Sequence, residues 1–143
     1  MQATAPLTLF GIDFGTRKIG VAVGQNVTRT AMGIAVIPVR NNEPDWLQLD
    51  KLVAQWKPGA FVVGMPLNMD GTASDMSAQA EKFARTLTER YQRPCHPVDE
   101  RLSTRAARDI GRSNAELTGK RYNDRSHVDA MAAQLLLESW FES

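Results

Sequence analysis

Three carboxylates in this 143-residue sequence lie next to segments that are otherwise apolar. Asp13 lies within the apolar run 7–14, Glu100 follows the run 95–99, and Asp129 precedes the alanine- and leucine-rich run 130–137. A carboxylate in apolar surroundings is costly unless it is hydrogen-bonded, paired with a cation or bound to a metal. Carboxylate oxygens suit Mg²⁺ and Mn²⁺, and two-metal phosphoryl chemistry needs several of them. We interpret Asp13, Glu100 and Asp129 as metal-binding and catalytic residues of one site, with Mg²⁺ or Mn²⁺ as the ion.

Each acid also has a structural interpretation, which the pattern leaves open. Asp13 could cap the turn that follows it, and Glu100 could be a solvated strand end paired with Arg101. Ser126 and Asp129 fit a capping box at the start of a helix. Asp99, directly before Glu100, points to the opposite face in a regular strand, so only one of the two faces the site.

The position of Asp129 on its expected helix favours a role in the site. Asp129 falls on one helical stripe with four apolar residues, namely Ala132, Ala133, Leu136 and Trp140. We therefore expect this stripe to face the sheet, and the two alanines to allow a close approach of the helix.

Positive charge concentrates in one segment of a nearly neutral chain. The whole chain carries a net +1, yet residues 101–127 hold seven basic and three acidic side chains, a net +4. Four arginines step by 4, 3 and 4 residues, which places them on one helical face: Arg101, Arg105, Arg108 and Arg112. We predict that this face binds a nucleic-acid backbone, and that Arg17, Lys18 and Arg101 neutralise the phosphates nearest the acids. The alternative is a solvated basic surface.

The order of apolar patterns predicts an α/β fold. Strands are expected at 7–14, 19–24, 33–39, 60–63 and 95–100, and helices at 46–56, 76–87, 103–111 and 127–141. Short connections make the first three strands an antiparallel meander, and the later helices are crossovers on the sheet faces. We expect one ribonuclease H-like domain over 1–143, a mixed five-stranded sheet with helices on both faces. The strand ending at Glu100 should lie beside the first strand.

The composition excludes several other classes of protein. No apolar run approaches the roughly 20 residues of a membrane span, and the first residues show no signal peptide. A single cysteine, Cys95, excludes an internal disulfide framework and a cysteine-cluster metal site. We expect a cytoplasmic protein that has no membrane partner.

Four segments in order resemble the motifs of the YqgF/RuvX family. They are GIDFGTRKIGVA from Gly11, GMPLNMDG from Gly64, DERLST from Asp99 and HVDAMAA from His127, and the resemblance covers residues 7–141. It implies a ribonuclease H-like hydrolase of the nuclease class that processes the 5′ end of pre-16S rRNA in ribosome biogenesis. It also implies that Asp13, Glu100 and Asp129 are the acidic positions of the family. His127 departs from the basic residue usual two positions before the last acid.

Three other functions are compatible with these residues. Holliday junction resolution, the older description of the family, would need a dimer that makes two symmetric cuts. A nucleotide-binding module is suggested by Asp-Phe-Gly-Thr at 13–16, although such proteins need two domains. An inactive RNA-binding scaffold is opposed by the intact acidic trio. We expect structured RNA as the partner, branched DNA as the alternative, and a monomer or weak dimer; roles for Asp99, Asp124 and His127 stay open.

Overall fold

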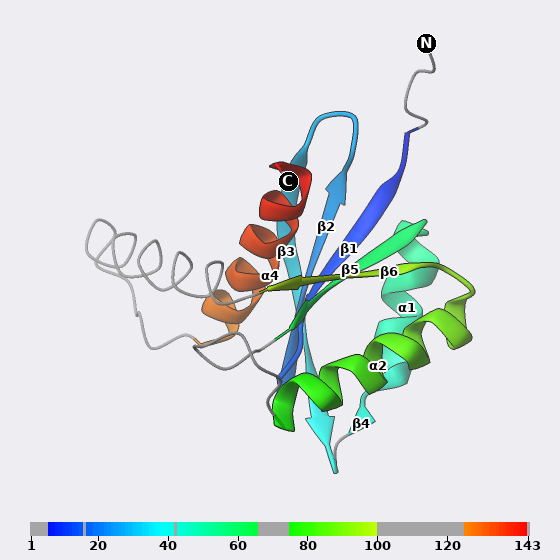
Figure 1. Cartoon of the computed structure of the whole chain (residues 1–143), viewed down its shortest axis with the longest axis vertical. Helices are drawn as coiled ribbons and strands as arrows, with labels where there is room; N and C mark the ends of the chain where they lie inside the picture. The colour runs from blue at the N-terminus through cyan, green and yellow to red at the C-terminus, as the bar shows by residue number, and fades with distance from the viewer. Residues whose placement is uncertain (1–5, 16, 42, 66–74, 100–124, 143) are drawn as a thin grey trace.

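The computed structural model describes residues 6–15, 17–41, 43–65, 75–99 and 125–142, and at 75 and 125–129 the helical backbone alone. Six strands and three helices lie within these residues (Figure 1). The strands are β1 (Thr8–Asp13), β2 (Lys18–Gln25), β3 (Thr30–Arg40), β4 (Glu43–Pro44), β5 (Ala60–Met65) and β6 (Cys95–Asp99). The helices are α1 (Trp46–Trp56), α2 (Asp75–Tyr91) and α4 (Arg125–Glu142).

The strands form one mixed sheet in the order β4-β3-β2-β1-β5-β6. The pairs β1–β2 and β2–β3 are antiparallel, which confirms the expected meander, and β1–β5 and β5–β6 are parallel. Two expectations were wrong. The sheet has a sixth strand, β4, whose two residues are too short to give a periodic signal. β6 pairs with β5 and not with β1, because the first crossover places β5 in the position next to β1.

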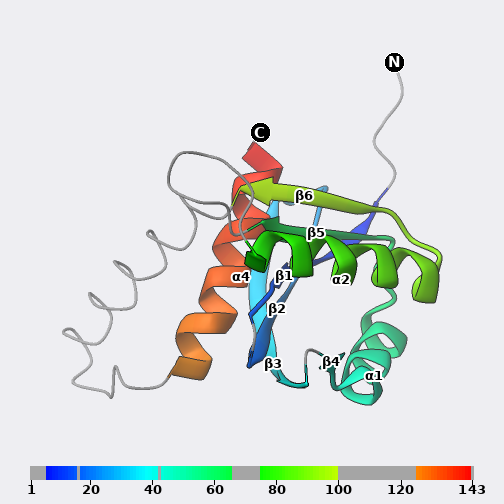
Figure 2. The same cartoon turned by 60° about the horizontal axis from the view of Figure 1, so that its bottom comes forward.

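Helices cover both faces of the sheet, as expected (Figure 2). On one face α1 and α2 bury large side chains against the sheet, among them Phe10, Phe61 and Phe83. On the other face α4 packs on Leu9, Ala22 and other small or aliphatic residues. β1 is therefore an interior strand that is covered on both sides, with Leu9 under α4 and Phe10 under α2.

α1 spans the residues expected from the sequence, 46–56. Asp45 caps its N-terminus by accepting a hydrogen bond from the Gln48 backbone N–H at 3.3 Å. Lys57 ends it in the left-handed conformation, and Pro58 follows. In contrast, α4 begins at Arg125, before the expected start at 127. Ser126 therefore lies within the helix and is not its N-cap, which contradicts the capping-box interpretation.

Part of the sequence prediction lies outside the described residues. This part includes the helix expected at 103–111, the four arginines on its proposed face, and Glu100. Residues 112–124, between that expected helix and α4, also lie outside the described residues.

Candidate functional site

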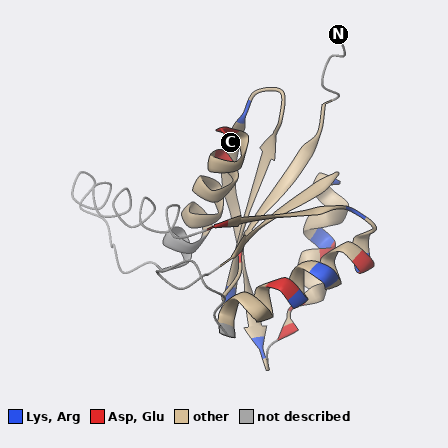
Figure 3. Cartoon of the chain, in the orientation of Figure 1, with Lys and Arg blue, Asp and Glu red and all other residues tan. Residues whose placement is uncertain are grey.

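Asp13 is the last residue of β1, at the carboxyl end of an interior strand. It is half-buried, and four fully buried or nearly buried residues precede it in the strand. Leu9 lies in the core under α4, and Gly11 lies against α4, so strand alternation places Asp13 on this same face. In open α/β sheets, ligands bind outside the carboxyl ends of strands. Figure 3 shows that β1 and β5 carry almost no charge along their length, and Asp13 is the single charged residue of β1.

The carboxylate lies beside a tight turn that reverses the chain into β2. A Cβ added to Gly15 would come within 2.6 Å of the Lys18 carbonyl oxygen, so only glycine fits this turn without movement of the backbone. Arg17 is exposed and Lys18 is half-buried just beyond it. Lys18 alternates with Ala22, which packs under α4, so Lys18 belongs to the face that carries Asp13. Two of the predicted phosphate-binding residues therefore lie at the same end of the sheet as Asp13.

α4 lies unusually close to this face because glycines line the strands beneath it. A Cβ on Gly33 would come within 2.7 Å of the Ala130 carbonyl oxygen. A Cβ on Gly11 would come within 2.9 Å of the Ala133 carbonyl oxygen and of the Leu137 Cβ. The expected close approach through alanines is confirmed, since Ala132 and Ala133 are both buried. We call Gly11, Gly24 and Gly33 the glycine seat of α4.

Two hydrogen bonds hold α4 lengthwise on the glycine seat. The Gly33 backbone N–H donates to the Gln134 side-chain oxygen at 3.0 Å. The Arg29 guanidinium donates to the Phe141 carbonyl oxygen at 2.7 Å, near the C-terminal end of the helix. These bonds tie the middle and the C-terminal end of α4 to the β2–β3 hairpin, so the helix has a defined position along its axis.

This arrangement brings the backbone of Asp129 toward the end of the sheet where Asp13 lies. Ala133 contacts Gly11, two residues before Asp13, and Leu137 contacts Gly11 and Gly24, nearer the other end. α4 therefore runs antiparallel to β1, and its first turns lie toward the carboxyl end of β1. Asp129 comes one helical turn before Ala133. Its expected stripe is confirmed at Ala132, Ala133 and Leu136, with Leu137 and Phe141 as further buried members.

Asp99 lies on the other side of the sheet. It ends β6 and lines a hollow between this strand and α2, together with Ser77 and Glu81. The neighbouring positions of β6 belong to the α4 face, where the His96 ring lies 5.3 Å from the Trp140 ring and Val98 packs on the α4 core. Alternation thus separates Asp99 from Asp13, whereas the choice of Glu100 over Asp99 stays a prediction because Glu100 lies outside the described residues. Because β5 lies between β6 and β1, these two strands are roughly 10 Å apart.

The described residues do not complete the acidic trio. No group of three His, Cys, Asp or Glu side chains that could hold a metal ion occurs among them. Glu100 and the Asp129 side chain fall outside what the structure describes, so Asp13 is the single member whose side chain is placed.

Among the helices described, none is long and apolar enough to cross a membrane.

Comparison with protein families decides the family of this chain. The family model described as RuvX, Holliday junction resolvase, matches residues 7–143. The chain belongs to the RuvX family. A Pseudomonas putida relative is 50% identical over 135 residues, which are 94% of each chain. An Azotobacter vinelandii relative is 49% identical over 137 residues, 96% of this chain and 94% of the relative. Both carry the name "Putative pre-16S rRNA nuclease".

Solved structures with a similar fold include two resolvases bound to junction DNA. The T. thermophilus RuvC complex with a Holliday junction substrate has a TM-score of 0.52 at 15% identity, covering 91% of this chain and 92% of RuvC. The Fowlpox virus resolvase complex with Holliday junction DNA has a TM-score of 0.56 at 13% identity, covering 95% and 97%. At such identities the likeness concerns the fold alone, and it confirms the ribonuclease H-like architecture of this RuvX-family chain.

Sequence reasoning missed the residues that position α4. Gly11, Gly24 and Gly33 are strand-interior glycines, a pattern that often marks the close approach of another backbone. That signal was present in the sequence, but it does not say which element approaches. Gln134 gave no signal, since a glutamine on a helix is ordinary until its partner on β3 is known.

Proposed function

We propose that this RuvX-family chain is a metal-dependent endonuclease that hydrolyses phosphodiester bonds in structured RNA, with the 5′ end of pre-16S rRNA as its substrate. The observation that carries the proposal is Asp13 at the carboxyl end of interior strand β1, on the face where α4 brings its first turns. The family match and the names of the two bacterial relatives support the reaction class and the substrate. The active unit is one domain that spans the chain.

The residues offered for the ion are compatible with Mg²⁺ or Mn²⁺. Asp13, Glu100 and Asp129 would supply only carboxylate oxygens, the ligands that these hard ions prefer. Asp13 is half-buried at a strand end, where water and a phosphate can still approach. The bound ion would supply Lewis acidity and favour deprotonation of the attacking water.

The chain itself would bind and orient the substrate. Lys18, on the face of Asp13, and Arg17, exposed in the turn, would pair with the phosphates that flank the cleaved bond. The glycine seat and Gln134 would hold α4 at a constant height above the sheet, with Ala130 over β3 and Ala133 over β1. Carboxylates from separate elements can act together only when their relative positions are constant, because a displacement of about 1 Å can cost a hundredfold in rate.

A cleavage assay tests this function directly. Matched RNA and four-way junction DNA substrates are incubated with the chain and Mg²⁺ or Mn²⁺. Asp13→Asn keeps the side-chain size and removes the charge, so RNA cleavage should fall by orders of magnitude while RNA binding is retained. Asp99→Asn, on the opposite face, is the matched control and should cleave at close to the wild-type rate, whereas Glu100→Gln should be strongly impaired. Equal activity of the Asp13→Asn and wild-type chains would contradict the proposal.

Holliday junction resolution is the second candidate, because the family model carries that description. The same acids would act, but resolution requires two active sites in one symmetric assembly. A junction cut at two symmetric positions, by a species that sediments as a dimer, would favour it. Cleavage of the RNA by a monomer would favour the ribonuclease.

The arginines at 101, 105, 108 and 112 provide a test of how the nucleic acid is held. We propose that they contact its backbone phosphates. Replacing Arg105 and Arg108 by alanine should weaken binding about equally for all RNA sequences. The slope of log binding constant against log salt concentration should become shallower by about 1–2. If this slope is unchanged in a folded variant, the phosphates of the nucleic acid contact Arg17, Lys18 and the basic residues at 120–125 instead.

A further inference from the structure

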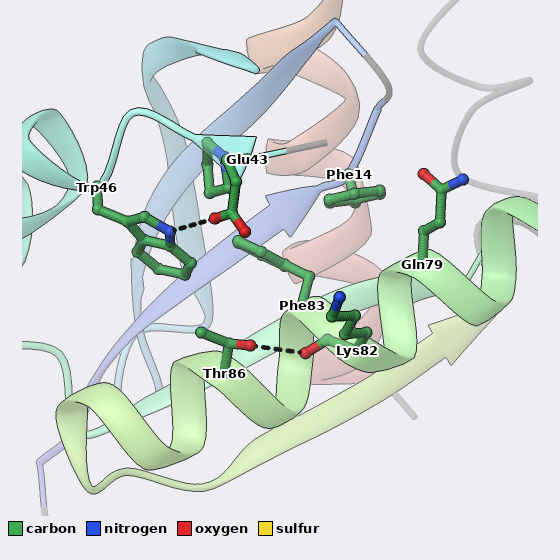
Figure 4. A pocket seen from close by; sticks show the side chains of 8 residues that line it. Phe14, Glu43, Trp46, Gln79, Lys82, Phe83 and Thr86 are labelled. Carbon is green, nitrogen blue, oxygen red and sulfur yellow. Dashed lines mark hydrogen bonds between the residues drawn. The ribbon is translucent and has the colours of Figure 1, made fainter. Parts of the chain in front are cut away.

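A cavity of about 130 Å³ opens between α2, β4 and the start of α1 (Figure 4). Three aromatic residues line it: Phe14 and Phe83, which are 6% and 5% exposed, and Trp46, which is half-buried. Phe83 lies between the other two, 5.7 Å from Trp46 in a stacked arrangement and 5.1 Å from Phe14. Pockets for drug-sized molecules run from about 300 to 1,000 Å³, so this one suits a single small planar group.

A few polar groups surround these rings. Glu43 accepts a hydrogen bond from the Trp46 indole N–H at 3.0 Å, which holds the indole plane in place. Lys82 and Thr86 project from α2 at the margin of the cavity, and Lys82 is exposed. The combination of flat apolar walls with a few hydrogen-bonding groups is typical of sites for heterocycles.

Gln79 supplies the observation that points to a ligand. Its side-chain oxygen is buried, and no donor among the described residues reaches it. Figure 4 shows the Gln79 side chain extending from α2 beside the ring of Phe14. A buried acceptor without a partner costs free energy, and a ligand N–H at this position would recover it. A purely apolar ligand would leave the acceptor unpaired.

The cavity lies close to the candidate catalytic acid. Phe14 directly follows Asp13, and alternation places the two on opposite faces at the same end of the sheet. An RNA strand whose phosphate reached Asp13 would therefore have to continue round this end of the sheet for a neighbouring base to enter the cavity.

We propose that this cavity binds a nucleobase, which packs against Trp46, the partly exposed ring of the three, and donates a ring N–H or amino group to Gln79. The ligand is either a free nucleotide or an unpaired base of an RNA strand. The RNA version rests on the proposed function, since it requires the strand to pass Asp13. Stacking of a base on an aromatic side chain tolerates any sequence, so Gln79 would supply the preference for a base with a donor at that edge.

Trp46 gives a direct probe of occupancy in the unmodified chain. The indole N–H signals of ¹⁵N-labelled protein are recorded by NMR during titration with AMP, GMP, CMP or UMP, and the Trp46 signal is identified by its loss in Trp46→Phe. We expect millimolar nucleotide to shift the Trp46 signal in a saturable way. Ribose 5-phosphate, which lacks a base, should leave it in place. Equal shifts with both would show phosphate binding and overturn the proposal.

Gln79→Met tests the hydrogen bond, because methionine matches the length of glutamine and lacks its acceptor. The variant should bind nucleotide about fivefold to tenfold more weakly, the loss of one hydrogen bond. It should unfold at an equal or higher temperature than the wild type, since the unpaired buried oxygen is gone. Gln55→Met, the same change at an exposed position of α1, is the control and should bind normally. Equal affinity of Gln79→Met and the wild type would contradict the role of Gln79.

Two further arms separate the sources of the base. A short single-stranded RNA that shifts Trp46 at lower concentration than free nucleotide supports a base from a strand. Shifts with nucleotide alone assign the site to a free nucleotide. Shifts with N-acetyl-tryptophanamide alone, or with none of these probes in a folded sample, overturn the proposal. The NMR readout needs no catalysis, so absence of cleavage with intact Trp46 shifts would contradict the proposed function and leave the base site standing.

Discussion

The two faces of the sheet are built by opposite means. Under α1 and α2 the contacts are made by large rings, with the Phe10 and Phe61 centroids 6.0 Å apart and Phe61 and Tyr91 5.6 Å apart. Under α4, glycines and alanines let backbone atoms of the helix come almost into contact with the strands, and aliphatic side chains such as Leu9 and Leu137 fill the remaining space. The first face gains stability from buried apolar area, whereas the second fixes a short distance between helix and strand.

The difference shows on which face of the sheet the distance between helix and strand is most tightly fixed. A face packed with flexible side chains can adjust by changing rotamers, and cores with conserved volume tolerate much substitution. A face in backbone contact cannot adjust without moving the helix. Asp13 and Asp129 both belong to the α4 side, so the side that would do chemistry is the one with least freedom.

Phe61→Ala should cause the largest loss of stability. Phe61 is fully buried under α2, and truncating such a ring costs about 3–5 kcal/mol. Urea denaturation measures it. Val62→Ala, the next residue on the same strand but facing α4, is the matched control and should cost less. A larger loss for Val62→Ala would break the distinction between the two faces.

Gly11→Ala should cost about 1–3 kcal/mol, an overpacking effect. The new Cβ would press on the Ala133 carbonyl oxygen and the Leu137 Cβ, and neither is the end of a flexible chain. Gly59→Ala is the control, since its new Cβ would meet the tip of the Leu7 side chain, which can rotate away. Thermal unfolding of both variants ranks them, and an equal loss would show that α4 shifts as easily as a leucine side chain.

Gln134→Met should cost about 0.5–1.5 kcal/mol, because the Gly33 N–H on β3 loses its partner. The specific sign is faster hydrogen exchange at the Gly33 amide. Gln55→Met, at an exposed position of α1, should leave the exchange rate of the Gly33 amide unchanged. Unchanged exchange in Gln134→Met would mean that the Gln134 side chain does not protect the Gly33 amide.

The smallest effect at neutral pH is expected for Asp50→Asn, in the clamp that joins α1 to α2. Arg90 donates two hydrogen bonds to the Asp50 carboxylate, at 2.9 and 2.7 Å, and the Tyr91 hydroxyl donates a third at 2.6 Å. The Arg90 bonds, followed by the Tyr91 bond, hold the pKa of Asp50 below its ordinary 3.8, against the opposing effect of burial. Both side chains of the ion pair are partly exposed, which limits its contribution.

The sign of the pH dependence follows from this lowered pKa. The stabilisation is complete above the unfolded-state value of 3.8 and is lost as the pH falls through the lower folded-state value. The melting temperature of the wild type should therefore fall more steeply below about pH 4 than that of Asp50→Asn. If the melting temperatures of the two proteins fall in parallel between pH 5 and pH 2, Asp50 does not lose this stabilisation by protonation.

Periodicity predicted most elements because each had a strong local signal. The spacing of Trp46, Leu49, Val53 and Trp56 gave the bounds of α1, and the apolar run 60–63 gave the core of β5. β4 was missed because two residues carry no period, and its pairing depends on the turn at Asn41. The start of α4 was misplaced because a capping signal at Ser126 competes with helix-compatible residues before it.

The position of Asp13 on its strand was predictable from the sequence, and the elements that surround it were not. The alternation of Leu9, Gly11 and Asp13 placed all three on one face, which the position of Gly11 under α4 supports. Which strand lies next to β1 depends on the crossover, and local patterns do not record it. The contacts of α4 with the glycine seat join residues about a hundred positions apart, so only the fold reveals them.

That long separation has a consequence for how the molecule is made. Gln134 bonds to Gly33 across 101 positions and Phe141 to Arg29 across 112. During synthesis the hairpin emerges early, and the helix that covers it, Arg125–Glu142, begins 85 residues after the hairpin ends at Arg40. Until then the glycine-lined side of the sheet is bare, and loop closure over that distance slows its burial. Translation rate and chaperones that shield exposed strands should thus affect the yield of this chain more than that of a protein with local contacts.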